Sequence, residues 1–396
     1  MSSLKTQVKY VANFRIFQFE IPRYIYVWHA LMGYWGGLVP DAAGTEKYNP
    51  TFRYPVQSPG NLSNMRDISM DCMDKYGVGT IDPSKASQFY DDLHKYLASQ
   101  DMDGVKVDVQ NILETISTGL GGRLKKKCYY RASDDYYPKN PTTQTLHIAA
   151  VAFNSVFLGE VVVPDWDMFY SLHCAAEYHA VARAVGGCGV YVSDKPGKHD
   201  FKILKRLVLA HGSVLRAKYP GRPTRDCLFS DPVMDGKRLL QKDVSGKISG
   251  KVFPADIEYF EEVSRKQWTG DCAVFSFNSG SLFRLSKEES FGVALTAMQC
   301  DVFAVSPIKV YNKKIEFAAM GLMNMYNSGG AVESVECISD SFSNCRILNK
   351  GRGGGSFGAY SSTKPKSCFV NSNNEDSKFS PQDKLLTVTI PSNTSL

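Results

Sequence analysis

Hydrophobic positions follow two alternating periodicities through the first 232 residues. Short runs rich in Val, Ile and Tyr, at 24–31 and 104–110, are typical of β-strands. Between these runs, Phe89, Leu93 and Leu97 recur at helical spacing behind a Pro-Ser start. The same criteria predict helices over 84–100, 145–159, 173–187 and 201–212, and a further strand over 189–194. This alternation is typical of parallel strands joined by crossover helices.

The pattern changes after residue 233, where helical periodicity becomes rare. Residues 272–285 alternate apolar and polar positions on both sides of an Asn-Ser-Gly turn, which is a hairpin signature. The alternation continues over 314–338 and 383–390, whereas the polar stretch 371–382 is predicted to be a loop. We therefore predict two domains, an α/β domain over 1–232 and an antiparallel β domain over 233–396.

The composition is that of a folded, water-soluble protein, because 43% of the 396 residues are hydrophobic and 22% are charged. Lys and Arg exceed Asp and Glu by 46 to 40, and only residues 125–127 form a tight basic run. So diffuse a charge predicts no nucleic-acid partner. Asn154 and Glu160 interrupt the most apolar stretch, 146–163, so we expect a buried helix leading into a strand and no membrane span.

Ten widely spaced cysteines with no Cys-x-x-Cys pair predict free thiols in a reducing compartment rather than a zinc ribbon or a redox dithiol. The first 23 residues mix polar and apolar positions and lack the continuous apolar core of a secretory signal. We therefore expect a cytoplasmic protein, and a plastid location stays open.

The residues predict neither a metal nor an organic cofactor. His173, Glu177 and His179 fall on one predicted helix, but histidines six positions apart do not align as a zinc pair would. The glycine-rich run 353–358 formally matches a dinucleotide motif, but it lies among predicted strands with no helix after it.

The strand at 104–110 carries the first candidate catalytic group. Its three valines share one face, so Lys106 and Asp108 point to the other. Polar side chains near the carboxyl end of a parallel strand are where barrel enzymes hold catalytic groups. The lysine favours an ionised Asp108, as a nucleophile requires, and the alternative is a structural ion pair.

A second carboxylate pair, Asp134 and Asp135, follows Arg131 in RASDDYYP. Because adjacent acids repel, one of the two is expected to hold its proton more tightly, as a general acid does. The alternative is a solvated turn.

Aromatic residues accompany further acids. In PDWDMF, Trp166 could stack on a sugar face while Asp165 and Asp167 bind hydroxyl groups, and the alternative is a loop with a buried tryptophan. Trp28 and Trp35 in YVWHALMGYWGG are either site aromatics or core residues. Together these motifs indicate glycoside chemistry by paired carboxylates.

These motifs resemble the plant raffinose synthase and seed imbibition protein family, an alkaline α-galactosidase-like branch of glycoside hydrolase family thirty-six. The resemblance also rests on DGVKVDVQNILE, VYVSDKPGKHDFKILKRLVL, GRPTRDCLFSDP and GLMNMYNSGGAVE, in family order along most of the chain. It implies a (β/α)8 TIM barrel followed by a C-terminal β-sandwich, here an incomplete barrel, with the catalytic domain over 1–232 and the sandwich over 233–396.

The resemblance also implies roles for individual residues. Asp108 matches the nucleophile, and Asp135, four residues after an arginine, matches the acid/base. Positions that line the sugar site in the family correspond here to Lys106, Arg131, Asp165, Trp166, Asp167 and Asp194, with weaker matches at Trp28, Trp35 and Asp134.

The implied reaction is retaining galactosyl transfer from galactinol to sucrose, which makes raffinose without a cofactor. One alternative is hydrolysis of raffinose-family oligosaccharides by an alkaline α-galactosidase. Compared with the family, the chain lacks segments before residue 24, between 122 and 131 and after 240. A second alternative is therefore a catalytically inactive, sugar-binding remnant.

Overall fold

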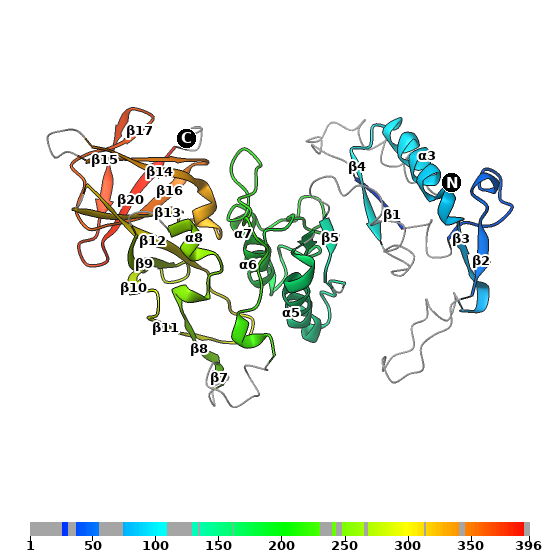
Figure 1. The fold of residues 1–396 in the computed structure, drawn as a ribbon, viewed down its shortest axis with the longest axis horizontal. Helices are drawn as coiled ribbons and strands as arrows, with labels where there is room; N and C mark the ends of the chain where they lie inside the picture. Colours follow the sequence, from blue (N-terminus) through cyan, green and yellow to red (C-terminus); the bar gives the residue numbers. More distant parts are fainter. Residues whose placement is uncertain are drawn as a thin grey trace. The chain divides into compact units, whose positions relative to one another are not determined.

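The computed structural model describes residues 26–30, 37–54, 74–108, 129–133, 135–160, 162–229, 240–242, 248–264, 268–312, 314–339 and 345–391 (Figure 1). They form two units, Met1–Lys126 and Lys127–Leu396, and each is described by itself.

The first unit contains a parallel strand pair and one long helix. Strand β1 (Tyr26–Ala30) pairs in parallel with β4 (Gly104–Asp108), and helix α3 (Ala86–Ala98) lies between them in the chain. The residues spaced for a helical face, Phe89, Leu93 and Leu97, are buried as predicted. The other elements are β2 (Thr51–Arg53), paired antiparallel with β3 (Val78–Thr80), and the 3-10 helices η1 (Glu46–Tyr48) and η2 (Pro83–Lys85).

The second unit begins with another strand–helix–strand arrangement. Strand β5 (Tyr129–Arg131) pairs in parallel with β6 (Val163–Asp165), and helix α5 (Pro141–Leu158) connects them. A parallel pair needs such a crossover, so the alternating pattern is confirmed here.

Helix α5 is only partly buried, whereas its apolar sequence predicted a buried helix. Leu146, Phe153 and Phe157 expose 55, 46 and 76% of their surface, but Gln144 and His147 face inward and expose 2 and 1%. Because the helix is apolar almost all round, no single apolar stripe decides which side faces the interior. Among the helices that the structure describes, none is both long and apolar enough to cross a membrane.

Helix α6 (Ala176–Gly186) ends as predicted at a glycine pair, with Gly187 in the left-handed region at φ 68°. The strand predicted over 189–194 is reduced to an isolated parallel bridge between Phe169 and Val192. The helix predicted over 201–212 is shortened to α7 (Phe201–Leu204), and a 3-10 helix, η3 (Arg225–Cys227), follows.

The rest of the second unit is mostly antiparallel sheet, as predicted. A curled seven-stranded sheet has the order β10-β9-β12-β13-β16-β20-β19 (Figure 1). Its strands are β9 (Trp268–Ser276), β10 (Leu282–Ser286), β12 (Phe303–Tyr311), β13 (Ile315–Leu322), β16 (Gly355–Ser361), β19 (Ser377–Phe379) and β20 (Leu385–Ile390). The predicted hairpin is β9 and β10, with Gly280 at φ 67° in its turn.

Smaller sheets flank this large one. They consist of β7 (Leu240–Lys242), β8 (Ile248–Val252) and β11 (Phe291–Leu295), of β14 (Val332–Ser339) with β15 (Cys345–Gly351), and of β17 (Cys368–Val370) with β18 (Asn373–Glu375). Short helices η4 (Pro254–Asp256), α8 (Phe260–Ser264) and η5 (Ser328–Ala331) connect strands. The prediction of a loop over 371–382 is wrong, because this stretch contains β18 and β19. The two strands were missed because their side chains are mostly polar and show no apolar alternation.

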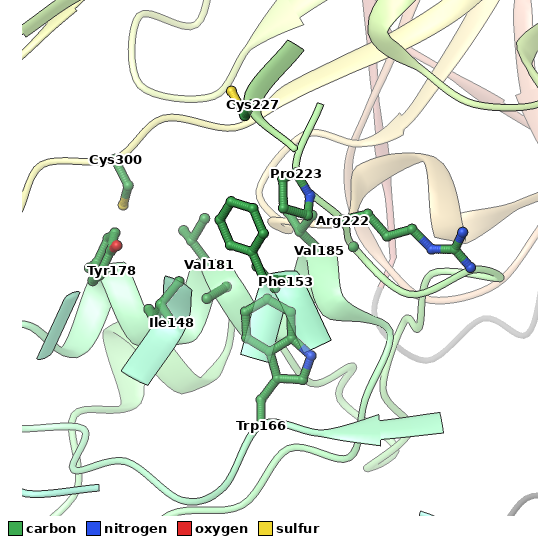
Figure 2. A pocket seen from close by; sticks show the side chains of 13 residues that line it. Ile148, Phe153, Trp166, Tyr178, Val181, Val185, Arg222, Pro223, Cys227 and Cys300 are labelled. Atoms are coloured by element: carbon green, nitrogen blue, oxygen red, sulfur yellow. The ribbon is translucent and has the colours of Figure 1, made fainter. Parts of the chain in front are cut away.

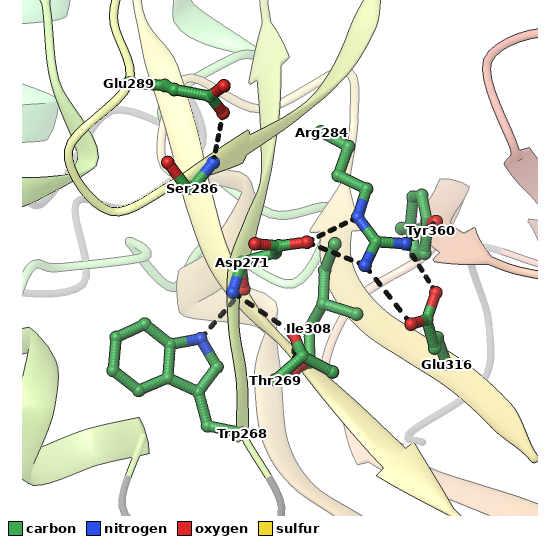
Figure 3. A network of polar contacts seen from close by, with 9 residues as sticks. All are labelled: Trp268, Thr269, Asp271, Arg284, Ser286, Glu289, Ile308, Glu316 and Tyr360. Atoms are coloured by element: carbon green, nitrogen blue, oxygen red, sulfur yellow. Dashed lines mark hydrogen bonds and ion pairs between the residues drawn. The ribbon is translucent and has the colours of Figure 1, made fainter.

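Arg284 on β10 forms hydrogen bonds with residues of three other strands of the large sheet (Figure 3). Arg284 on β10 donates from Nε to Asp271 on β9 at 2.7 Å, and from Nη1 to Glu316 on β13 at 2.6 Å. Nη1 also donates to the hydroxyl of Tyr360 on β16 at 3.0 Å. The hydrogen bond to Glu316, followed by that to Asp271, raises the pKa of Arg284 despite its partial burial.

The helical and sheet parts of the second unit share a core. Phe169 and Leu207 pack in one cluster with Tyr326, with Phe277 packed against it. Arg206 donates to Glu177 at 2.6 Å, and its guanidinium lies over the rings of Phe277 and Tyr326. The boundary predicted at residue 232 thus falls inside this unit, and a division there stays a prediction.

Candidate functional site

Charged residues stand at the carboxyl ends of both parallel strand pairs. In the first unit, Asp108 is the last residue of β4, and Lys106 pairs with Trp28 of β1. In the second unit, Arg131 at the end of β5 is directly opposite Asp165 at the end of β6. This is the end at which α/β enzymes hold their catalytic groups.

The two predicted catalytic aspartates belong to different units. Asp108 lies in the first and Asp135 in the second, so their pairing as nucleophile and acid/base stays a prediction. Asp135 is exposed, and its carboxylate accepts a 3.4 Å hydrogen bond from the hydroxyl of Tyr137. Trp35 and Asp134 lie outside the described residues.

Asp165 is held by a tyrosine that the sequence analysis did not single out. Tyr191 donates its hydroxyl to the two carboxylate oxygens of Asp165 at 3.0 and 2.9 Å. The backbone N–H of Asp167 donates to the same carboxylate at 3.0 Å. Burial, and then the charge of Asp165, raises the pKa of Tyr191, so its hydroxyl stays a donor.

Asp167 is 1% exposed and has the left-handed backbone conformation, with φ at 58°. An aspartate tolerates this conformation better than most residues because its short side chain bonds locally. Its carboxylate accepts from the backbone N–H of Tyr136 at 3.1 Å. This bond joins the segment after β5, which carries Asp135, to the segment after β6.

Arg183 on helix α6 holds the backbone of the segment after β6 by hydrogen bonds. It is 1% exposed, and its guanidinium donates to the carbonyls of Trp166, Asp167 and Met168 at 2.5, 3.2 and 3.2 Å. Burial lowers the pKa of Arg183, and nearby Cys188 and Asp167 oppose that effect. Three carbonyl acceptors and a buried cation thus fix the turn on which the candidate acids stand.

His173 and His179 make separate structural contacts. His179 accepts from Arg183 at Nδ1 over 2.9 Å, which assigns the proton to Nε2, 3.0 Å from Oε1 of Gln144. Burial, then the charge of Arg183, lowers the pKa of His179 to about 2. His173 contacts the carbonyl of Pro138 at 2.8 Å. Within the described ranges, no group of three His, Cys, Asp or Glu residues is placed to hold a metal ion.

Trp166 is buried, as in the alternative of a core tryptophan. The residue is 3% exposed, and its ring packs so closely on α6 that a Cβ at Gly186 would lie 2.6 Å from Cε2. Figure 2 shows the ring at a largely apolar cavity of about 420 Å³, beside Phe153, Val181 and Val185. Among the described residues of this unit, Asp165, Asp167 and Asp194 do not line this cavity, so the ring of Trp166 faces a different space from these carboxylates. A role in sugar stacking stays a prediction.

Asp194 is anchored by two other side chains. Its carboxylate accepts from the N–H and hydroxyl of Ser171 at 2.8 and 2.6 Å and from His199 at 3.0 Å. Burial alone would raise the pKa of Asp194, but these hydrogen bonds together hold it below the usual value. The carboxylate is thus ionised and fixed next to the bridge at Val192.

One missed residue left a signal in the sequence. Arg183 interrupts the apolar run of helix α6 between two alanines, and a charge at a buried helical position requires partners. Tyr191 and Ser171 left no comparable signal, because hydroxyl-bearing residues are ordinary in strands and loops.

Comparison with known proteins identifies the family. The family model described as raffinose synthase or seed imbibition protein Sip1 matches residues 3–132, 124–242 and 241–390. The chain belongs to this family. The three matches meet at 124–132 and 241–242, close to the two internal gaps that the sequence analysis proposed.

Curated relatives carry galactosyltransferase names. The chain is 42% identical to "Probable galactinol--sucrose galactosyltransferase 1" of Arabidopsis thaliana, over 93% of this chain and 58% of the relative. It is 40% identical to "Probable galactinol--sucrose galactosyltransferase 6" of the same plant, over 89% and 55%. It is 33% identical to the "Galactinol--sucrose galactosyltransferase" of Pisum sativum, over 94% and 56%. The chain therefore spans just over half the length of these relatives.

Proposed function

We propose that this chain transfers an α-galactosyl group from galactinol to sucrose and so makes raffinose with retention of configuration. The observation that carries the proposal is the position of Asp108, the last residue of a parallel strand, within the motif that matches the family's nucleophile. Family membership and the names of the relatives support the same reaction.

The fold proposed for this reaction is an incomplete (β/α)8 barrel followed by a β-sandwich. The pairs β1–β4 and β5–β6 would be parts of the barrel, because both are parallel and both end in charged residues. The curled antiparallel sheet would be the main sheet of the sandwich.

The proposed cycle has two displacements. In the first, Asp108 attacks the anomeric carbon of galactinol while Asp135 gives its proton to the departing oxygen. In the second, Asp135 takes the proton of a sucrose hydroxyl, whose oxygen attacks the same carbon and releases Asp108. The exposure of Asp135 suits a group that must exchange protons with two different alcohols.

Residues around the acids would bind the sugar. Asp165 and Asp194 are fixed by Tyr191 and Ser171, so they would meet hydroxyl groups with carboxylates already oriented. Lys106 and Arg131 would supply positive charge at the strand ends. Neither a metal nor an organic cofactor has a part in this cycle.

The competing candidate is an inactive remnant that binds sugar. It is favoured by one observation, the match to the family model in three separate stretches. Hydrolysis of α-galactosides is the competing reaction of the same site, and it differs only in water replacing sucrose.

The test is to incubate the full chain with galactinol, with and without sucrose, and to measure raffinose and free galactose. We expect sucrose-dependent raffinose, at a rate that falls by about 10³-fold or more in Asp108→Asn. Asp103→Asn is the matched control, because Asp103 is exposed and directly precedes β4. Galactose without raffinose would establish a hydrolase. Neither product, from chain with a cooperative unfolding transition, would establish the remnant.

Asp108→Gly with azide tests the role of the nucleophile. A small side chain leaves room for azide to attack the anomeric carbon from the same face. We expect β-galactosyl azide from this variant and none from Asp103→Asn. Failure to form the azide, while the unmodified chain is active, would exclude Asp108 as the nucleophile.

A further inference from the structure

Two cysteines face each other across the β14–β15 hairpin. In this antiparallel pair Cys337 is opposite Ile347 and Cys345 is opposite Ser339, so the cysteines are diagonal neighbours. Their Sγ atoms are 2.7 Å apart, although the residues are eight positions apart in the sequence. All eight cysteines that the structure describes are free thiols.

The surroundings hold this pair in place. Cys337 and Cys345 are half-buried and pack against a core cluster that contains Tyr311, Phe317 and Leu386. Seven register pairs align β14 with β15. A thiol–thiol contact is a weak hydrogen bond, so the sheet and not the contact keeps the sulfurs together. Neither cysteine has a part in the proposed galactosyl transfer.

We propose that Cys337 and Cys345 form a modification site, a dithiol that low-molecular-weight disulfides such as oxidised glutathione convert to an intramolecular disulfide. In the cytoplasm that we expect for this protein the pair would rest as two thiols, as in the structure. A rise in oxidised glutathione would then convert the two thiols to the disulfide.

The exchange has two balanced steps. Burial raises the pKa of the Cys345 thiol to about 11, and the hydrogen bond with Cys337 adds to this, so Cys345 enters second and the exchange begins at the sulfur of Cys337. As the thiolate, this sulfur attacks one sulfur of oxidised glutathione, forms a mixed disulfide and releases one glutathione thiolate. Cys345 loses its proton to that thiolate or to water, attacks the sulfur of Cys337 and releases the second glutathione. The two cysteines are oxidised by two electrons, and oxidised glutathione is reduced to two thiols.

The measurement is peptide mapping of the full chain without substitutions. The chain is treated with oxidised glutathione, blocked with iodoacetamide under denaturing conditions, and cut with trypsin and with a protease specific for the N-terminal side of Asp. Cleavage at Asp340 and after Arg346 places Cys337 and Cys345 on different peptides, so only a disulfide joins them. We expect the joined pair as the main form of both cysteines, and its loss after dithiothreitol.

Cys174 is the matched control, because it is an exposed thiol. It is expected to carry at most one glutathione and to join no other peptide. In Cys345→Ser, the second step is blocked, so Cys337 should keep its glutathione. The proposal is overturned if both cysteines are recovered with iodoacetamide, or if each carries its own glutathione without a joined pair. Both outcomes are read from the full chain without substitutions, and neither depends on activity with galactinol.

Discussion

The hydroxyl of Tyr191 lies 3.0 and 2.9 Å from the two carboxylate oxygens of Asp165, at the end of strand β6. When a partly buried carboxylate loses a hydrogen-bond donor, the folded state is destabilised, because the carboxylate is still shielded from water and has no new partner. The tyrosine therefore fixes the orientation of Asp165 before any substrate arrives.

Tyr191→Phe is expected to lower the free energy of unfolding by about 1–2 kcal/mol, because it removes a hydrogen bond to a charged group and little else. Urea unfolding measures the change. Tyr219→Phe is the control, since Tyr219 is 45% exposed and its substitution should stay within about 0.5 kcal/mol. Equal effects of the two substitutions would contradict the role given to Tyr191.

Arg183→Met should cost about 3 kcal/mol or more, because it removes the buried donor to the carbonyls of Asp167 and Met168 and one of the two buried partners of the Trp166 carbonyl, the other being His147. Arg183→Lys keeps the charge but loses the planar fork, so an intermediate cost is expected. Arg225→Met, at an exposed position, is the comparison. If all three variants unfold at the same urea concentration, Arg183 does not organise this turn.

The stability of the second unit should fall below neutral pH because of His179. The pKa of His179 is about 2 in the folded chain, and that of an unfolded histidine is 6.5. Above pH 6.5 both states are neutral; below it the unfolded chain binds the proton first, so stability falls by about 1.4 kcal/mol per pH unit. Urea unfolding near pH 7.5, 6.5 and 5.5 measures this fall in the free energy of unfolding. We expect the fall to be smaller in His179→Gln than in the parent chain. The same loss in both proteins would mean that other groups cause it.

Gly186→Ala should destabilise, although alanine is favoured over glycine by about 1 kcal/mol inside a helix. The added Cβ would lie 2.6 Å from the ring of Trp166, and such overpacking typically costs about 1–3 kcal/mol. Gly189→Ala is the matched substitution, because nothing lies within 4 Å of its Cβ. Thermal unfolding should separate the two variants. A midpoint for Gly186→Ala at or above that of the parent would show that the ring moves at no cost.

Local signals predicted the elements that form from neighbouring residues. Helix α3 and the β9–β10 hairpin follow from periodicity and from a turn, which the chain specifies within about a dozen residues. The edge strands β18 and β19 were missed because their polar side chains need no apolar alternation when one face is exposed. Helix α5 was placed correctly but its buried face was not, since Gln144 contacts His179 and His147 contacts the carbonyl of Trp166, both distant in sequence.

The candidate site divides in the same way. The acids at strand ends could be proposed from the sequence, because charge at the end of an apolar run is a local pattern. Their partners could not, since Tyr191, Arg183 and Ser171 reach Asp165, Trp166 and Asp194 through tertiary contacts. Sequence spacing gives no information on a contact that closes only when separate segments pack.

The core in which Tyr326 and Phe277 meet Phe169 and Leu207 has a consequence for heat denaturation. Two segments that share buried aromatic rings cannot melt one after the other without exposing those rings to water. Scanning calorimetry of residues 127–396 should therefore record one cooperative endotherm. A cut of the chain at residue 232 would separate Phe169 from Tyr326 and Phe277 and so expose these rings to water.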